Sequence, residues 1–417
     1  MNRPGELSRL YEEYKRIKDK KQSLDMTRGK PSPVQLDTMQ KLLTAVQTNE
    51  DCIDGNIDCR NYGVFDGLPK AKMLFSELLD ISPDQIVVCG NSSLNIMYDT
   101  IAHAMLLGTG KGAKPWCKYE KLSFLCPSPG YDRHFRVTQF FGFNLIYIPM
   151  LPTGPDMELI EKIVSEDESV KGMWCIPKYS NPTGYTFSDD TVIRLAKMKT
   201  AAKDFRVFWD NAYAVHDLYD TSDNLLNVLE EAYKYGNEDR FLIFASTSKI
   251  SYSGAGISCF ASSADNVKWF KDALKVQTIG HDKINQLRHV KIFPDLKAIK
   301  SQMDIHRKIL LPKFELVLNC FEKEFSDFSE ISWTKPRGGY FISLTVLNNT
   351  AKRVVSLAKE AGLLLTSAGS GFPYEIDPND NNIRIAPSFP SCEELEKALE
   401  LLVICVKIAY YEAKETK

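Results

Sequence analysis

The chain has 417 residues, of which 44% are hydrophobic and 25% are charged, and its formal net charge is -2. These values are typical of a globular protein with two or three lobes, and a nearly balanced charge argues against nucleic-acid or membrane partners. No apolar run approaches the roughly 20 residues of a membrane helix, and the charged first segment lacks the apolar core of a secretory signal.

The ten cysteines are scattered singly, without a C-x-x-C pair. Several of them, such as Cys89, Cys175 and Cys259, lie inside apolar runs. This pattern favours buried thiols in a reducing cytoplasm over a disulfide framework. The six histidines show no metal-ligand spacing beside cysteines or carboxylates, so we expect no metal site.

Helical and extended patterns alternate along most of the chain. Leu7, Leu10, Tyr14 and Ile17 predict a first amphipathic helix. Strands separated by helices indicate a mostly parallel sheet that is covered on both faces. The strands are predicted at 85–90, 121–127, 143–150, 170–177, 205–210, 241–246 and 256–262, and the helices between them at 91–107, 155–166 and 188–204.

The pattern changes after about residue 290. A long helical stretch leads to a strand at 338–346, a helix, strands at 362–367 and 382–387, and a final helix from Ser391. This order predicts a smaller α+β lobe. We expect residues 1–50 to form an N-terminal arm and part of the small domain, 51–295 the large α/β domain, and 296–417 the C-terminal small domain.

Polar residues follow the predicted strands at their carboxyl ends, where open α/β sheets bind ligands. Ser92 and Ser93 begin a helix, and the free N–H groups there favour an anion such as phosphate. The other residues at strand ends are Asn181, Asp210, Tyr213, Ser246 and Lys249. Lys249 stands among hydroxyls and glycines, which suggests a nucleophile rather than a solvated lysine.

The ordered set "NPTG", "D-x-A-Y", "S-x-S-K" and the arginine of "NIRIAP" resembles the pyridoxal-phosphate-dependent aminotransferases of fold type I. Asp210 follows Asn181 by 29 residues, Lys249 follows Asp210 by 39, and Arg384 follows Lys249 by 135. With "NYGVFDGLPKAK" and "RGKP", the resemblance covers nearly the whole chain. In "DMTRGKPSP", "KYSNPTGYTFSDD" and "TSKISYSGAG", the chain is most similar to the bacterial Ic subgroup of aspartate aminotransferases.

The resemblance implies a large, mostly parallel sheet of about seven strands with a smaller α+β domain, and pyridoxal 5'-phosphate as cofactor. Lys249 would form a Schiff base with the cofactor and then move the substrate proton. Asp210 would pair with the pyridine nitrogen. The other implied cofactor contacts are Tyr213 and Asn181 on the ring oxygen, Tyr131 stacked on the ring, Ser92, Ser93, Ser246 and Ser248 on the phosphate, and Tyr62 from the partner in a homodimer.

The substrates implied are amino acids and 2-oxo acids, with L-aspartate and 2-oxoglutarate preferred. Arg384 would bind the substrate α-carboxylate with its planar fork, and Gly29 would let the backbone approach the same group. One guanidinium cannot hold both ends of so short a dicarboxylate. Arg28, Lys178 and Lys283 are the three cations that could read the side-chain carboxylate.

One position departs from the family pattern. Gly256 or Ile257 stands where an arginine commonly pairs with the phosphate, which puts the strength of cofactor binding in question. Aminotransferases for aromatic or aliphatic amino acids and β-lyases share the same cofactor residues and stay open. A cofactor-sensing regulator would need a basic winged-helix module before the core, and a nucleotide-binding protein would need a glycine-rich loop that the sequence lacks.

Overall fold

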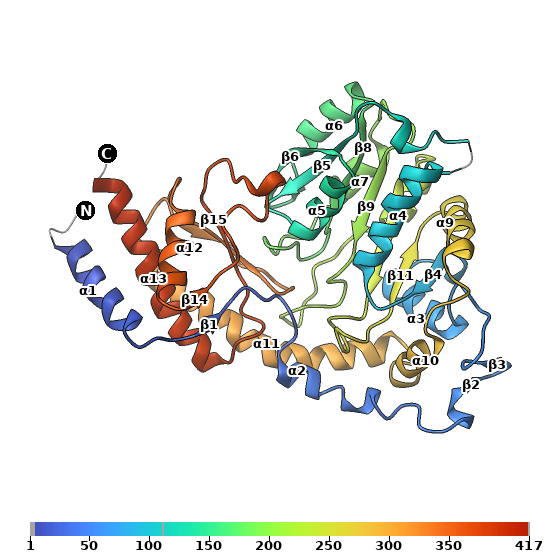
Figure 1. Ribbon diagram of the computed structural model, residues 1–417, viewed down its shortest axis with the longest axis horizontal. Coiled ribbons are helices and arrows are strands. Elements are labelled where there is room, and N and C mark those ends of the chain that lie inside the picture. The colour runs from blue at the N-terminus through green and yellow to red at the C-terminus, as the bar shows by residue number, and fades with distance from the viewer. Residues whose placement is uncertain (1–4, 111, 416–417) are drawn as a thin grey trace.

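The structure is a computed structural model that describes residues 5–110 and 112–415 (Figure 1). The outer ends of the two terminal domains predicted from the sequence, residues 1–4 and 416–417, lie outside the described residues. The boundaries at 50/51 and 295/296 stay predictions. The described residues contain no helix long and apolar enough to cross a membrane.

An eight-stranded sheet, with strand order β4-β11-β10-β9-β8-β5-β6-β7, forms the large lobe. Every neighbouring pair from β10 to β6 is parallel, whereas β11 is antiparallel to β10 and β4, and β7 is antiparallel to β6. The two-residue β7 is the strand beyond the expected seven. The bounds are β4 Ile86–Cys89, β5 Ser123–Ser128, β6 Asn144–Leu151, β7 Gly154–Pro155, β8 Val170–Cys175, β9 Arg206–Asp210, β10 Phe241–Ser246 and β11 Ser258–Ala261.

Both faces of this sheet are buried from β4 to β5 in sheet order, as the apolar runs of those strands require, whereas β6 is partly exposed. In β9, Val207 and Trp209 pack into one core, whereas Phe208 between them packs into the core on the opposite face. Helices α3, α6, α7, α8 and α10 contribute to the first core and α4, α5 and α9 to the second. Their bounds are α3 Pro69–Leu79, α4 Ser93–Leu107, α5 Asp132–Phe140, α6 Met157–Glu166, α7 Asp189–Lys197, α8 Val228–Tyr233, α9 Ala264–Gln277 and α10 Lys283–Ile292.

The end of α7 differs from the sequence prediction, which carried this helix to residue 204. Ser188 caps the helix start as expected by accepting from the Thr191 N–H, but the helix ends at Lys197. The buried Arg240 guanidinium donates to the carbonyls of Leu195 and Ala196, at 2.9 and 3.2 Å from Nη1. A residue more than 40 positions away therefore binds the last carbonyls, which local patterning does not reveal.

The second lobe packs α1, α12, α13 and most of α11 around a three-stranded sheet of order β12-β13-β15. In the predicted strand 362–367 only two residues pair, as β14 with β1, and the chain beyond them forms a loop. The bounds are α1 Glu6–Lys18, β1 Leu24–Asp25, α11 Leu296–Phe325, β12 Ser332–Trp333, β13 Ile342–Thr345, α12 Ala351–Glu360, β14 Leu363–Leu364, β15 Asn382–Ile385 and α13 Cys392–Glu415. Three short elements, α2 Pro33–Asp37, β2 Ile53–Asp54 and β3 Ile57–Asp58, lie between β1 and α3.

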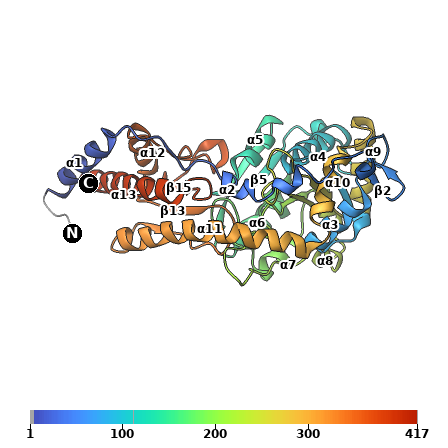
Figure 2. The ribbon, with the colours of Figure 1, turned by 90° about the horizontal axis from the view of Figure 1, so that it is seen from below.

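The 30-residue helix α11 joins the two lobes (Figure 2). Ile299 and Met303, near its start, pack into a core with Leu74 and Ile250 of the large lobe. The later residues from Leu310 to Phe325 pack into the core of the small lobe. The candidate site lies between these lobes.

Candidate active site

Lys249 lies in the turn that follows β10. Thr247 is fully buried and fixes this turn, since its hydroxyl accepts from the Ile257 N–H at 2.9 Å and its carbonyl accepts from the Ile250 N–H at 2.8 Å. The Lys249 Nζ lies 4.9 Å from the centroid of the Tyr213 ring. Burial lowers the pKa of Lys249, and the nearby charge of Asp210 partly offsets that shift. A lysine held this way keeps a neutral amine available at a lower pH than an exposed lysine does.

Asp210 is the last residue of β9 and is 3% exposed. Its Oδ2 lies 3.1 Å from the His134 Nε2, whereas its Oδ1 is buried without a hydrogen-bond partner anywhere in the described chain. A buried carboxylate oxygen without a donor is costly. The site therefore has room for one further donor at Asp210.

His134 is the residue that the sequence reasoning missed. It lies on α5, stacks on Trp174 at 4.5 Å between ring centroids and meets Tyr131 edge-on at 4.9 Å. One side chain thus orients both the carboxylate of Asp210 and the aromatic ring expected to stack on the cofactor. Its position three residues after Tyr131, the N-cap residue of α5, was the available signal, since the first turn of the helix brings the two residues together.

Arg384 lies on β15 of the small lobe and reaches the large lobe. Its guanidinium donates to Thr366 Oγ1 at 3.0 Å and to Asn181 Oδ1 at 3.5 Å, and it lies 3.8 Å from Asp132. Its Nε is buried without a partner in the described ranges. Asn181, which lies just after β8 and its connecting turn, is thereby brought next to Arg384.

Gly29 and Arg384 both lie against the ring of Phe341. A Cβ at Gly29 would lie 1.9 Å from the Cζ of Phe341, and that ring lies 4.9 Å from the Arg384 guanidinium carbon. Only glycine leaves room for Phe341 here. Thr27, two residues before Gly29, offers its carbonyl to Arg384 at 3.4 Å.

The predicted anion pocket collects hydroxyls around the start of α4. The Ser246 and Ser248 hydroxyl oxygens lie 2.5 Å apart, and the Ser248 hydroxyl donates to the Asn91 carbonyl at 2.8 Å, which leaves the Ser246 hydroxyl to donate to Ser248. Ser92 caps α4 and Ser93 is its first residue, so free backbone N–H groups lie beside these hydroxyls.

Gly256 shows why no arginine occupies the family's usual position. A Cβ at Gly256 would lie 3.0 Å from both the N and the Oγ of Ser248, so the hydroxyl pair fills the space that a side chain would need. Ile257 points into the core instead and is 1% exposed.

Four predicted residues lie apart from this group within the single chain. Tyr62 is 80% exposed, and Arg28 is exposed next to Thr27. Lys178 is buried, donates to the Ala214 carbonyl and Ser222 Oγ, and lies 3.5 Å from Asp217. Lys283 is buried at the start of α10, close to Gly280.

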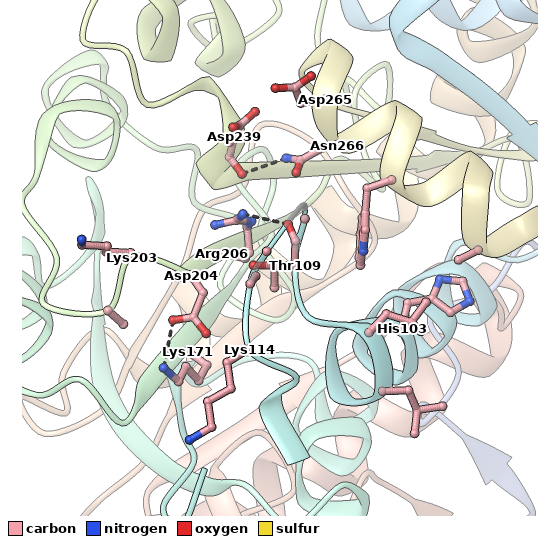
Figure 3. Close-up of a pocket in the computed structure, with 18 of the residues that line it drawn as sticks. His103, Thr109, Lys114, Lys171, Lys203, Asp204, Arg206, Asp239, Asp265 and Asn266 are labelled. Carbon is pink, nitrogen blue, oxygen red and sulfur yellow. Dashed lines mark hydrogen bonds and ion pairs between the residues drawn. The ribbon is translucent and has the colours of Figure 1, made fainter. Parts of the chain in front are cut away.

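A cavity of about 1320 Å³ opens at the opposite edge of the sheet from Lys249 and Asp210, where β8 and β9 begin (Figure 3). Two of its charged side chains have polar partners: Lys171 donates to Asp204 at 2.9 Å, and the buried Arg206 donates to the carbonyls of Phe205 and Thr109, although its Nε has no partner among the described residues. None of the predicted site residues lines it. The convergent chemistry of the chain therefore lies at the carboxyl edge of the sheet.

Comparisons with known proteins agree with this arrangement. The family described as aspartate amino-transferase matches residues 3–417. The chain belongs to this family. The aminotransferase is 44% identical over 407 residues to an aspartate aminotransferase of Corynebacterium glutamicum, a match that covers 97% of this chain and 94% of the relative.

Solved structures support the same assignment. A structure of an aspartate transaminase from Corynebacterium glutamicum matches with a TM-score of 0.95 and 43% identity, covering 98% of the aminotransferase and 96% of that chain. An α-aminoadipate aminotransferase from Thermus thermophilus matches with a TM-score of 0.76 at 17% identity, covering 97% and 95%, and shows the shared fold alone. The fold-type I architecture expected from the sequence is confirmed.

Membership of the aminotransferase family implies pyridoxal phosphate, and the residues present fit that group. The unpartnered Asp210 Oδ1 suits a protonated ring nitrogen, which is a donor. The hydroxyls and free N–H groups at the start of α4 suit a phosphate. Lys249 supplies the amine that an aldehyde requires.

Proposed function

We propose that this aminotransferase is an aspartate aminotransferase that converts L-aspartate and 2-oxoglutarate to oxaloacetate and L-glutamate. The observation that carries the proposal is the convergence of Lys249, Asp210 and Arg384 from both lobes, with one oxygen of Asp210 still free of partners in the described chain. The name of the 44% identical relative supports aspartate as the donor.

Each residue has a distinct task in this proposal. When bound, pyridoxal phosphate supplies an aldehyde that bonds to amino groups and a ring that withdraws electrons from the substrate Cα. Asp210 keeps a negative charge beside the ring nitrogen, and His134 holds its carboxylate in place. Lys249, whose pKa is lowered by burial, would carry the proton of a 1,3-shift, taking it from the substrate Cα and delivering it two atoms away.

Arg384 binds the α-carboxylate of every substrate. Its fork is held by Thr366 and Asn181, so the carboxylate enters a site whose donors already have fixed directions. Burial lowers the pKa of Arg384, and the nearby Asp132 carboxylate opposes that shift. An incoming carboxylate replaces part of the charge compensation that Asp132 gives.

The remaining question is which cation binds the side-chain carboxylate of the substrate. Lys178 is committed to Asp217 and Ser222, so its charge is already compensated. Arg28, which is exposed beside Thr27, is the remaining accessible candidate from the sequence, whereas Lys283 is buried within its own chain.

We also propose a cytoplasmic homodimer. All ten cysteines are free thiols, which suits a reducing compartment. The Tyr62 side chain is 80% exposed, so it is available to complete the phosphate site of a second copy.

The test joins labelling to specificity. Borohydride reduction of the yellow protein followed by peptide mass spectrometry should place the cofactor on Lys249, and kcat/KM should be higher for aspartate than for alanine, leucine or phenylalanine. Lys249→Ala should lose turnover, whereas Lys313→Ala should retain it, because Lys313 is a buried lysine that donates to Ser388 in the other lobe. A label on another lysine would refute the site, and preference for an uncharged donor would refute aspartate.

A further inference from the structure

The backbone of Lys249 faces a buried polar cluster at the junction of the two lobes. The carbonyl of Lys249 accepts from the Tyr340 hydroxyl at 3.4 Å, and Tyr340 is fully buried just before β13 of the small lobe. The same hydroxyl accepts from the Gln35 amide at 3.2 Å. Gln35 belongs to α2, which packs on α11 at this junction (Figure 1). The turn that carries Lys249 is therefore tied to the small lobe and to the N-terminal segment.

His216 lies between two aromatic rings next to Lys249. Its ring meets Tyr213 and Tyr340 edge-on, at 5.4 and 5.6 Å between centroids, and His216 is 3% exposed. Both of its ring nitrogens are buried without a hydrogen-bond partner among the described residues. A neutral imidazole has one N–H donor and one acceptor nitrogen, and leaving both unpaired in the interior is costly. The fold therefore keeps a polar ring at this position although it lowers stability.

His306 of α11 reaches the same junction, and the network around it locates its proton. Thr38 donates its hydroxyl proton to the Gln35 carbonyl at 2.6 Å, so its oxygen accepts from the Gln302 amide at 2.6 Å. The second N–H of that amide donates to His306 Nε2 at 3.1 Å. The neutral ring therefore carries its proton on Nδ1, which is buried without a partner in the described chain.

Both histidine rings lie near the backbone of Lys249 without hydrogen-bonding to it. Burial lowers the pKa of His216 well below its usual value and that of His306 to about 4, and in each case the neighbouring backbone of Lys249 opposes the shift. Both rings are therefore neutral at neutral pH. The Tyr340 hydroxyl makes the one hydrogen bond to the Lys249 carbonyl within the described residues.

We propose that Tyr340 is a positioning residue for Lys249, and that His216 and His306 complete the cluster that fixes the Lys249 carbonyl. The inference rests on the proposed function, because it needs Lys249 to be the reacting lysine. Tyr340 is 0% exposed, so no substrate atom reaches it and its influence passes through the backbone of Lys249. A displacement of a reacting group by about 1 Å can slow a reaction by about two orders of magnitude.

The first test follows the amine of Lys249 without turnover. In the full-length protein freed of cofactor, labelling with acetic anhydride from about pH 6 to about pH 10, read by peptide mass spectrometry, gives the pKa of that amine. Tyr340→Phe should raise this pKa by at least about 0.5, because an amine on a looser turn reaches water more easily. The variant retains the other titratable groups near Lys249, and burial keeps all but the first of them uncharged over this range: Asp210, Tyr213, His216 and His306.

Tyr14→Phe is the matched control for the lost hydroxyl. The buried Tyr14 hydroxyl also donates to a backbone carbonyl, that of Leu357 at 2.8 Å, within the core of the small lobe. This variant should lower stability and leave the pKa of Lys249 unchanged. In the holoenzyme, Tyr340→Phe should lower kcat about ten-fold for aspartate and alanine alike and keep KM within two-fold, since Arg384 still binds the α-carboxylate.

A second pair of variants tests the histidines. His216→Leu removes the ring nitrogens near the Lys249 carbonyl and should lower kcat in the same way. His103→Leu also removes a buried, unpartnered ring nitrogen, but at the cavity on the far edge of the sheet, and should leave kcat unchanged. Thermal unfolding is measured for every variant, and rates are expressed per folded molecule.

The outcomes separate this inference from the proposed function. If borohydride places the cofactor on Lys249 while Tyr340→Phe matches Tyr14→Phe in kcat and in the pKa of Lys249, the positioning proposal alone is overturned. If the cofactor is found on another lysine, the proposed function fails and the positioning proposal fails with it.

Discussion

Asp210→Asn removes one negative charge with almost no change in volume. The carboxylate is buried at the end of β9, and its only hydrogen-bond partner in the described chain is His134. An amide in its place can still accept from one donor, but it no longer favours a protonated ring nitrogen. We expect the variant to fold and to bind cofactor more weakly.

The magnitude follows from Coulomb's law. Two unit charges about 4 Å apart interact by about 4 kcal/mol at an effective dielectric constant of about 20. The hydrogen bond that the amide can still make offsets about 1 kcal/mol of this loss. A net loss of about 3 kcal/mol corresponds to a decrease in kcat/KM of about two orders of magnitude.

The assay is steady-state transamination of aspartate at saturating pyridoxal phosphate, with thermal unfolding measured in parallel. Asp204→Asn is the matched control, because Asp204 is a buried carboxylate that binds Lys171 and Trp116 at the far edge of the sheet. That variant should lose stability and keep its kcat per folded molecule. A kcat/KM of Asp210→Asn within three-fold of wild type would refute the role given to Asp210.

Three further predictions follow from the same structure. Arg384→Ala should lower kcat/KM for every amino acid by a free energy of about 2–5 kcal/mol, because a buried pair with the α-carboxylate is lost. Gly29→Ala should cost about 1–3 kcal/mol of stability and raise KM, because Phe341 must move, whereas Gly254→Ala has open space around it and should change little. His289, whose pKa is lowered by burial to about 4, should make the free energy of unfolding fall by about 1.6 kcal/mol between pH 6.5 and pH 5, and His289→Asn should remove that part of the slope.

The sign of the pH effect follows from the direction of the shift. The unfolded chain binds a proton on this histidine at about pH 6.5, whereas the folded protein resists until about pH 4, so acidification favours unfolding. Denaturant titrations at both pH values measure the slope, and an equal slope in the variant contradicts the reasoning. For Arg384→Ala, an effect confined to dicarboxylic substrates would contradict its role. For Gly29→Ala, unfolding and KM equal to those of Gly254→Ala would contradict the steric account.

The parts of the fold that depend on local pattern were predictable. The strands β4, β5, β8, β9, β10 and β11 are short, mostly apolar and buried, and Asp210 ends β9 while Lys249 follows β10, so sheet topology brings those two residues together. The end of α7 was not predictable, because Arg240 determines it from 43 residues beyond Lys197. The sequence contains no local sign of that contact.

The residues of the candidate site also include some whose place could be predicted from the sequence and some whose place could not. Arg384 and Asn181 each belong to a motif of the ordered set, but the contact between them comes from the structure and was not predicted. Lys178 was attractive by its position near Asn181, but Asp217 and Ser222 lie 39 and 44 residues along the chain and bind its ammonium. The loop after β14 was missed because "GLLLTS" reads as one strand, whereas only Leu363 and Leu364 pair with β1.

The long helix α11 has a consequence for how the protein loses its structure. Its first turns belong to the core that contains Ile299 and Met303, and its later turns belong to the core that contains Phe314 and Phe321. Melting either core exposes part of the same 30-residue helix, in which only Pro312 lacks an N–H for the hydrogen-bond ladder, so neither lobe can come apart without weakening the other. Heat denaturation of the chain should then appear in a calorimeter as one cooperative peak rather than two.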